Sequence, residues 1–196
     1  ATVWTNTAKG ILRNTDVLIH EGKVKAVGEK LDALALFPGK NKPTVTEVDG
    51  TGRHLTCGIV DEHSHIAISR GVNEGSHHIT SEVRIGDVIN PDAIGWYREL
   101  AGGLTAVNQL HGSANPIGGQ NQVIKLRRGA IAEQMKFEGA IPDIKFALGK
   151  NPKGSNWGDN ATTRYPQTRS GVEQIIRDEF TAARDYRQAW ADFKAG

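Results

Sequence analysis

From Gly58 onward, short apolar runs alternate with helical or long polar connections, and this alternation constrains the fold more than any other feature. The four runs read GIVDEHSH, GGLTAVNQLHG, NQVIKLRRG and IPDIKFALG, and the helical stretch PDAIGWYRELAG precedes the second of them. Strands that are separated by helices or long connections favour a parallel β/α architecture. In a barrel of that kind, the chemistry gathers at the C-terminal ends of the strands.

The first 56 residues have a different pattern, which predicts a small β-sandwich part. DVLIHEGKVKAVG gives two short strands, 17–20 and 23–27, joined at Glu21-Gly22. Gly22 supplies the positive φ that a tight hairpin requires. TVTEV predicts a further strand over 44–48, and Asp-Gly and Thr-Gly turns follow it. We therefore divide the chain into residues 1–56 and residues 57–196.

The second part ends in a long helix. Ser170 and Glu173 have the spacing of a capping box, and an apolar stripe with helical spacing runs from Val172 to Phe193. We interpret this stripe as a packing face rather than as a partner-binding helix.

Composition excludes several classes of protein. The 196 residues are 38% hydrophobic and 23% charged, as in an ordinary globular protein. A net charge of +2 without a basic run argues against a nucleic-acid binder. No stretch approaches the roughly 20 apolar residues of a membrane span. The lone cysteine, Cys57, excludes an internal disulfide framework and a cysteine-based zinc site, and we expect its thiol to be buried and inert. The compartment, cytoplasmic or exported, stays open.

The motif GIVDEHSHIA places two histidines one residue apart at the end of an apolar strand. Side chains alternate between the two faces of a strand, so Asp61, His63 and His65 point to one side. Two imidazoles stacked on one face can bind the same metal ion. Taken alone, the spacing favours two histidines that only pack or form hydrogen bonds, and the rest of the sequence has to change that interpretation.

The surrounding sequence resembles the amidohydrolase superfamily. The stretch VDGTGRHLTCGIVDEHSH is similar to the segment in which a β-sandwich leads into a (β/α)8 barrel, whose first strand closes with Gly-x-x-Asp-x-His-x-His. GGLTAVNQLHGSANPIGGQNQVIKLRRG and RYPQTRSGVEQ resemble a bacterial branch near imidazolonepropionase and the metallo-dipeptidases. Cys57 stands where the family usually has proline. The resemblance implies an α/β fold in which a β-sandwich unit precedes the first half of a (β/α)8 barrel.

The same resemblance implies a metal centre. His63 and His65 match the two ligands on the first strand, and imidazole suits zinc first, with iron, cobalt, manganese or nickel as alternatives. One or two divalent ions are expected. Lys145 is the best match to a lysine that CO₂ carboxylates into a bridging ligand, and Lys125 is the competitor. Alternatively, Lys145 is a strand residue whose amine reaches the surface.

Other polar residues carry weaker expectations. His111 ends the second strand and either lines a substrate cleft or has a structural role. Asp61 is expected to orient a ligand. Asn115, Gln120 and Asn121 either contact a polar substrate or serve the turn around Gly118-Gly119, and turn chemistry is the simpler explanation. His77 and His78 are adjacent on an extended connection, so their side chains face apart and are poor joint ligands.

The implied activity is hydrolysis of a C–N bond in a small amide, lactam, imide or dipeptide by metal-activated water. The family takes two further histidines and a proton-shuttling aspartate from later strands, whereas the last histidine here is His111. We therefore expect no catalytic residue of that kind in this chain. We expect the chain to be inactive alone, to be completed by the other barrel half, possibly supplied as a separate chain, and to form a homo-oligomer. The alternatives are a non-catalytic relative and a metal-stabilised scaffold or transport-type binding module.

Overall fold

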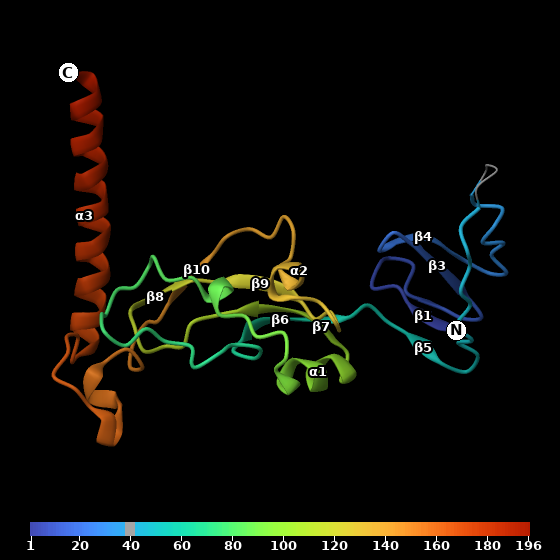
Figure 1. Ribbon diagram of the computed structural model, residues 1–196, viewed down its shortest axis with the longest axis horizontal. Helices are drawn as coiled ribbons and strands as arrows, with labels where there is room; N and C mark the ends of the chain where they lie inside the picture. The colour runs from blue at the N-terminus through green and yellow to red at the C-terminus, as the bar shows by residue number, and fades with distance from the viewer. Residues whose placement is uncertain (38–41) are drawn as a thin grey trace. The chain divides into compact units, whose positions relative to one another are not determined.

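In the computed structural model, residues 1–37 and 42–196 are described, and they divide into two units, Ala1–Gly58 and Ile59–Gly196 (Figure 1). The first contains five short strands, and the second contains five strands and three α-helices together with short 3-10 turns.

The strands of the first unit form two small sheets. The order β2-β1-β5 joins β1 (Thr2–Trp4) to β2 (Ile11–Leu12) antiparallel and to β5 (His54–Leu55) parallel. The other sheet is the predicted hairpin, β3 (Asp16–His20) with β4 (Lys23–Gly28). Its turn has positive φ at both Glu21 (50°) and Gly22 (70°), which matches the twist of the flanking strands. The sandwich arrangement of these sheets stays a prediction.

Two expectations for this unit are wrong. Residues 44–48 form no strand, because the pattern TVTEV has no pairing partner among the described residues. Cys57 is exposed rather than buried. Its Sγ contacts Asn6 Nδ2 at 3.9 Å.

The second unit is built around a three-stranded sheet in the order β6-β7-β9. The strands β6 (Ile59–Ser64) and β7 (Leu104–Gln109) pair in parallel, as the sequence predicts, with α1 (Ile94–Ala101) just before β7. In contrast, β9 (Gln122–Lys125) pairs antiparallel to β7, and β10 (Ile144–Phe146) pairs antiparallel to β8 (Ile117–Gln120). The expectation that all four runs form parallel strands is therefore wrong, and the described residues form no closed barrel.

The core of the second unit lies on one face of this sheet. It consists of Ala67, Ile89, Trp96, Val107, Ile124, Leu126 and Met135. Val107 and Ile124 are cross-strand partners and are fully buried, so the helix-side face of β7 and β9 carries the apolar packing. Trp96 of α1 adds its ring to this cluster and donates its indole N–H to the carbonyl of Pro91 at 2.9 Å.

The remaining helices are α2 (Ala132–Met135) and the long α3 (Arg169–Ala195). The N-cap of α3 is Thr168, whose hydroxyl accepts a hydrogen bond from Gly171 N at 3.0 Å. The expected capping box at Ser170 and Glu173 is wrong, because the helix begins one residue before Ser170. Figure 1 draws the later turns of α3 clear of the strands. None of the helices in residues 1–37 and 42–196 combines the length and the apolar run that crossing a membrane would require.

Candidate active site

Of the two histidines of the His-x-His motif, His63 lies in the last part of β6 and His65 directly follows the strand. Their ring centroids are 5.2 Å apart and the rings meet edge to face. Ser64, which lies between them, is buried, whereas both imidazoles are exposed. Alternation along the strand thus places the two rings next to each other on an accessible side of β6.

The ring of His65 has a defined tautomer. Its Nδ1 lies 2.9 Å from the carbonyl oxygen of Leu110, and a carbonyl can only accept, so Nδ1 carries the proton. Leu110 is held in turn, because its N–H donates to the carbonyl of Ser64 at 3.0 Å. The lone pair of His65 Nε2 is left free to bind another group.

Lys145 of β10 reaches the same place from 82 residues away in the sequence. It is only 9% exposed, and its Nζ lies 3.4 Å from His63 Nε2. Burial lowers the pKa of Lys145. The pKa of His63 is lowered by burial first, then by the charges of Lys145 and His65. Both groups therefore tend towards their neutral forms, which have a lone pair to offer.

The competing lysine lies elsewhere. Lys125 Nζ stands 4.1 Å from the centroid of the Phe137 ring, a cation–π contact on β9. The structure thus brings Lys145, and not Lys125, to the histidine pair.

His111 is enclosed rather than open to a ligand. It is 2% exposed and its Nδ1 donates to the carbonyl of Val72 at 3.1 Å. Its Nε2 is buried without a hydrogen-bond partner in the described residues and faces Gly119. A Cβ at Gly119 would lie 2.6 Å from that nitrogen, so the close contact requires glycine there. These contacts favour the structural alternative for His111.

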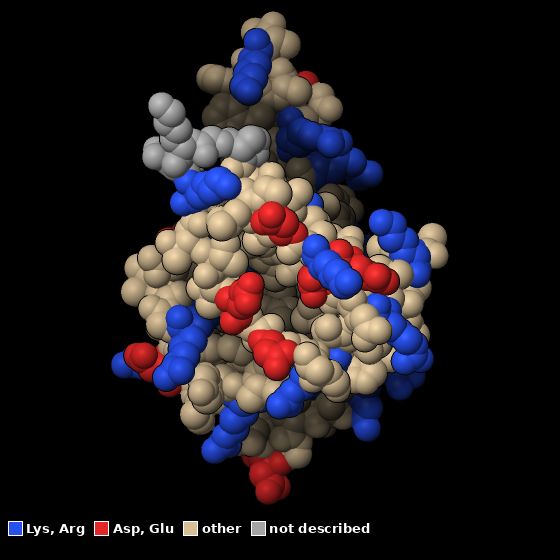
Figure 2. Space-filling view, turned by 90° about the vertical axis from the view of Figure 1, so that its right-hand side faces the viewer, with Lys and Arg blue, Asp and Glu red and all other residues tan. Residues whose placement is uncertain are grey.

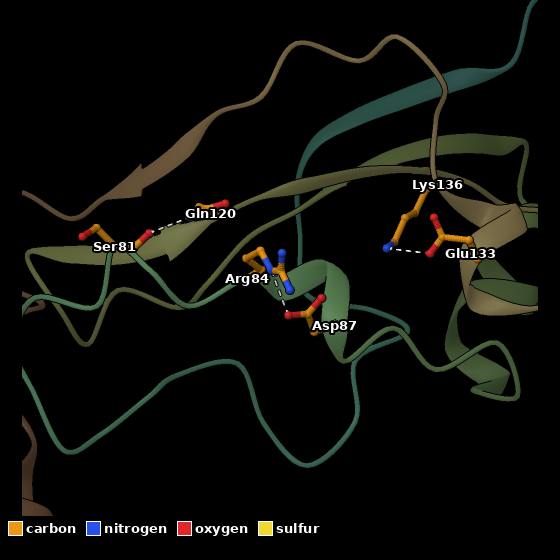
Figure 3. Close-up of polar contacts among 6 residues, drawn as sticks. All are labelled: Ser81, Arg84, Asp87, Gln120, Glu133 and Lys136. Carbon is orange, nitrogen blue, oxygen red and sulfur yellow. Dashed lines mark hydrogen bonds and ion pairs between the residues drawn. The ribbon is translucent and has the colours of Figure 1, made fainter.

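The other polar residues singled out from the sequence bond locally. Asp61 Oδ1 accepts from the backbone N–H of His63 at 3.1 Å, so this carboxylate orients the main chain of a histidine rather than a ring. The fully buried Asn115 donates to the carbonyl of Glu74 and to Thr80 Oγ1. Gln120 donates to the carbonyl of Ser81 at 3.1 Å (Figure 3).

Sequence reasoning missed two polar groups. Asp143 Oδ2 accepts from Asn108 and from Asn121, at 2.8 and 2.9 Å, and so joins β7, the junction of β8 and β9, and the residue before β10. Arg164 binds three backbone carbonyls in two loops. The Asp143 group had a signal, since two of its members lie at the ends of predicted strands. Arg164 had none, because its partners are main-chain atoms.

A cavity of about 470 Å³ lies apart from the histidines and is lined by residues of the ranges 84–87, 120–123 and 136–144. Neither histidine nor Lys145 lines it. Four of the charged side chains at or beside it form ion pairs, Arg84 with Asp87 at 2.9 Å and Lys136 with Glu133 at 2.8 Å (Figure 3), and the carboxylate of Asp143 accepts from the amides of Asn108 and Asn121. Basic and acidic residues also intermix on the face drawn in Figure 2. The histidine pair with Lys145, and not this cavity, therefore carries the candidate chemistry.

A metal ion would find an incomplete set of ligands here. Among the described residues, no three His, Cys, Asp or Glu side chains come together in a group that could hold a metal ion. Two imidazoles and one lysine nitrogen are what the residues described in Ile59–Gly196 bring together.

Comparison with known proteins gives the following relatives. No family model matches the chain. The amidohydrolase tasK of Hapsidospora irregularis is 33% identical over 186 residues, covering 86% of this chain and 18% of that protein. The imidazolonepropionase of Idiomarina loihiensis is 35% identical over 66 residues, covering 34% of this chain and 15% of that protein.

The fold has a counterpart among solved structures. A crystal structure of an amidohydrolase from Thermotoga maritima matches with a TM-score of 0.74 and 36% identity, covering 89% of this chain and 44% of that one. The chain therefore spans less than half the length of each of these relatives. Since sequence and structure both match amidohydrolases along most of its length, the chain belongs to the amidohydrolase superfamily.

Proposed function

We propose that this chain supplies the first metal ligands of an enzyme that hydrolyses a C–N bond of a small amide, lactam, imide or dipeptide. The observation that carries the proposal is the approach of Lys145 Nζ to within 3.4 Å of His63 Nε2, beside the ring of His65. Three nitrogen groups, from β6, the residue after it and β10, converge there. Such an arrangement suits a cation that the nitrogens, once neutral, would bind.

The state of each group fits a metal such as zinc. The bond from His65 Nδ1 to Leu110 fixes the tautomer that presents Nε2, as an outer hydrogen bond commonly does for a metal-bound histidine. The lowered pKa of His63 favours the neutral ring, which is the form that binds metal. Three donors are fewer than the four of a tetrahedral site, so the remaining donors have to come from other groups.

Lys145 has the surroundings that carboxylation requires. Only the unprotonated amine attacks the carbon of CO₂, forming an N–C bond and losing one proton to give the carbamate anion. Because burial lowers the pKa of Lys145, a larger share of its amine is unprotonated at neutral pH than in a solvated lysine. The carbamate would add oxygen donors next to His63.

A metal bound here would lower the pKa of a bound water and polarise the carbonyl of the substrate. The residues of this chain would hold the site: His63 and His65 as nitrogen donors, and Lys145 as a nitrogen or carbamate donor. Asp61 keeps the main chain of His63 in place. The proton shuttle and the remaining donors, by this proposal, belong to strands outside these residues.

The sheet edges support the need for further strands. β6 is the terminal strand of its sheet, with Ile59 60% and Val60 65% exposed. β10 pairs only with β8 in the described part of the chain, and Leu148 just after it is 73% exposed. Unpaired strand edges with exposed apolar residues favour pairing with other strands. We propose that strands from the other half of the barrel cover them; a homo-oligomer stays a prediction.

The test is a double substitution, His63→Ala with His65→Ala, in the complete enzyme. Metal content by mass spectrometry and hydrolysis of a panel of small amides should be lost together. The matched control is His77→Ala with His78→Ala, a histidine pair on the following loop, which should keep both. Unchanged metal content and rate in the first variant would contradict the proposal. Metal bound without any turnover in the unsubstituted protein would favour the binding or scaffold alternative.

A further inference from the structure

The long helix α3 is packed at its beginning and bare for the rest of its length. Val172 and Ile175 in its first turns are 2% and 4% exposed. Further along the helix, Tyr186, Trp190 and Phe193 are 67%, 47% and 77% exposed. Among the described residues, the predicted packing face therefore has partners only over its first turns, up to the stacking of Phe180 on Phe146 with ring centroids 6.1 Å apart.

The buried Val172 and the exposed aromatic residues belong to one stripe along the helix. Starting at Val172, its members follow at alternating spacings of four and three residues: Val172, Ile176, Glu179, Ala183, Tyr186, Trp190 and Phe193. All but Glu179 are apolar. A strict seven-residue repeat of this kind keeps one seam facing a neighbouring helix and is typical of left-handed helix pairs. The spacing thus indicates that a helix, rather than a sheet or a flat surface, covers the bare part.

The aromatic side chains form a continuous surface on this stripe. The rings of Tyr186 and Trp190 meet edge to face with centroids 6.3 Å apart, and those of Trp190 and Phe193 with centroids 5.8 Å apart. Together with Ala189 they line a shallow groove. Aromatic rings in such a groove are typical anchors of a helix-in-groove contact.

The two flanks of the stripe differ in charge. One flank carries Arg187 and Lys194, each directly after a stripe residue, and Lys194 Nζ lies 6.0 Å from the centroid of the Trp190 ring. The other flank carries Ala182 and Ala189, which allow a close approach. Charges beside the seam of a helix pair select the partner, so a complementary helix has acidic residues on the side facing Arg187 and Lys194.

Two other occupants fit less well. In an antiparallel pair of α3 helices the basic flanks would face each other, and in a parallel pair they would face alanines, so a second copy supplies no acidic partner. A membrane surface attracts helices with an excess of positive charge. Over Arg169–Ala195 five basic residues are balanced by five acidic ones: Arg169, Arg177, Arg184, Arg187 and Lys194 against Glu173, Asp178, Glu179, Asp185 and Asp192.

We propose that the exposed face of α3 is a docking site for an amphipathic helix of another polypeptide, with apolar residues at seven-residue periodicity and acidic residues along the edge that meets Arg187 and Lys194. This contact is separate from the strand pairing at the sheet edges. It does not depend on the hydrolase activity.

The probe is a synthetic helical peptide of about three heptads, with leucine at the seam positions and glutamate along one flank. A matched peptide carries lysine instead of those glutamates. Calorimetric titration of the 196-residue chain should show at least tenfold tighter binding of the glutamate peptide, and added salt should reduce the difference. If the chain precipitates when purified alone, soluble recovery on refolding with each peptide is compared instead, with the same expected preference.

Variants separate the seam from the charge. Trp190→Ala with Phe193→Ala should weaken binding of the glutamate peptide at least tenfold, whereas Gln188→Ala on the opposite side of α3 should leave it unchanged. Arg187→Glu with Lys194→Glu should reverse the preference towards the lysine peptide.

Four results would overturn the proposal. They are equal binding or equal recovery with the two peptides, no binding of either peptide, a concentration-dependent dimer in sedimentation that Trp190→Ala abolishes, and binding of the chain to anionic phosphatidylserine vesicles through the same stripe. The dimer would assign the face to a second copy, and the vesicles would assign it to a membrane.

Discussion

Arg164 connects the loops that follow β6 and β7 to the segment before α3, and its removal gives the sharpest test of how this end of the second unit is held. Its Nη1 donates to the carbonyls of Gly75 at 3.1 Å and His77 at 2.7 Å, and its Nη2 donates to Ala114 at 3.0 Å. The guanidinium also lies 4.8 Å from the centroid of the Trp157 ring. No other side chain can match this planar set of donors, lysine included.

The loss of stability expected for Arg164→Ala follows from the surroundings of each hydrogen bond. A hydrogen bond from a charged donor contributes about 1.5–3 kcal/mol, and the bond to Ala114 is partly buried, so its loss should cost close to that. The bonds to Gly75 and His77 are exposed, and water can replace them, so each should cost about 0.5 kcal/mol. With about 0.5 kcal/mol for the contact with Trp157, Arg164→Ala should destabilise the second unit by about 3–4.5 kcal/mol.

The assay is urea unfolding, combined with amide hydrogen exchange of residues 72–80. Arg164→Ala should lower the urea midpoint and speed exchange in that loop, and Arg164→Lys should recover less than half of the loss. Arg127→Ala is the matched control, because Arg127 makes one exposed bond to the carbonyl of Gln134, and its loss should cost under about 0.5 kcal/mol. Equal costs for Arg164→Ala and Arg127→Ala, with unchanged exchange, would refute the reasoning.

Three further substitutions test the local geometry. Gly119 has φ +126°, where side chains are strained, and a Cβ there would strike His111 Nε2, so Gly119→Ala should cost about 3 kcal/mol in urea unfolding. Gly139 has φ +75° and open space around it, so the control Gly139→Ala should cost only about 1 kcal/mol. Equal costs for the two substitutions would contradict the clash with His111. Thr168→Ala should cost about 1 kcal/mol by loss of the N-cap of α3, whereas Ser170→Ala should be neutral in the same assay. Burial lowers the pKa of Lys145 below 10.5, so between the pKa of the folded state and 10.5 the unfolded chain binds more protons, and the free energy of unfolding should rise with pH across that window. Lys145→Met should raise the free energy of unfolding below the window and remove its slope with pH. A slope that persists in Lys145→Met would assign the pH dependence to other groups.

The sequence alone was sufficient where local periodicity decides the outcome. The hairpin at Glu21-Gly22, the parallel pair β6–β7 and the helices α1 and α3 follow from alternation, turn chemistry and helical spacing. Sequence reasoning failed where the direction of strand pairing decides the topology. The 12 residues between β7 and β9 contain no helix, and a parallel pairing needs a crossover of about that length or more, usually a helix. The absence of a helical pattern there was the signal for an antiparallel return.

Sequence reasoning on the candidate site was limited for a related reason. Alternation places His63 and His65 together, because both lie on one strand. The position of Lys145 depends on two pairings, β10 with β8 and β6 with β7, and so on contacts 82 residues apart in the sequence. The family resemblance favours Lys145 over Lys125, but their apolar surroundings, which the two lysines share, do not explain the difference. It follows from register, since Lys145 pairs with Gly119 whereas Lys125 pairs with Ala106 and packs on Phe137.

The register of β10 on β8 also explains why His111, which is no metal ligand, is needed near the site. Gly118 lies between His111 and Lys145: a Cβ on Gly118 would lie 3.1 Å from the Cβ of His111 and 3.5 Å from the Cγ of Lys145. His111 closes this layer from one side, and Lys145 runs along the other towards His63. An alanine at Gly118 would therefore touch the lysine at an ordinary contact distance, whereas a branched side chain there would need the space that the stem of Lys145 occupies. Gly118→Leu should reduce metal content in the complete enzyme more than Gly118→Ala, and His111→Gln, which keeps a side chain against Gly118, should retain most of it. Full metal content in Gly118→Leu would show that Lys145 reaches His63 without this support.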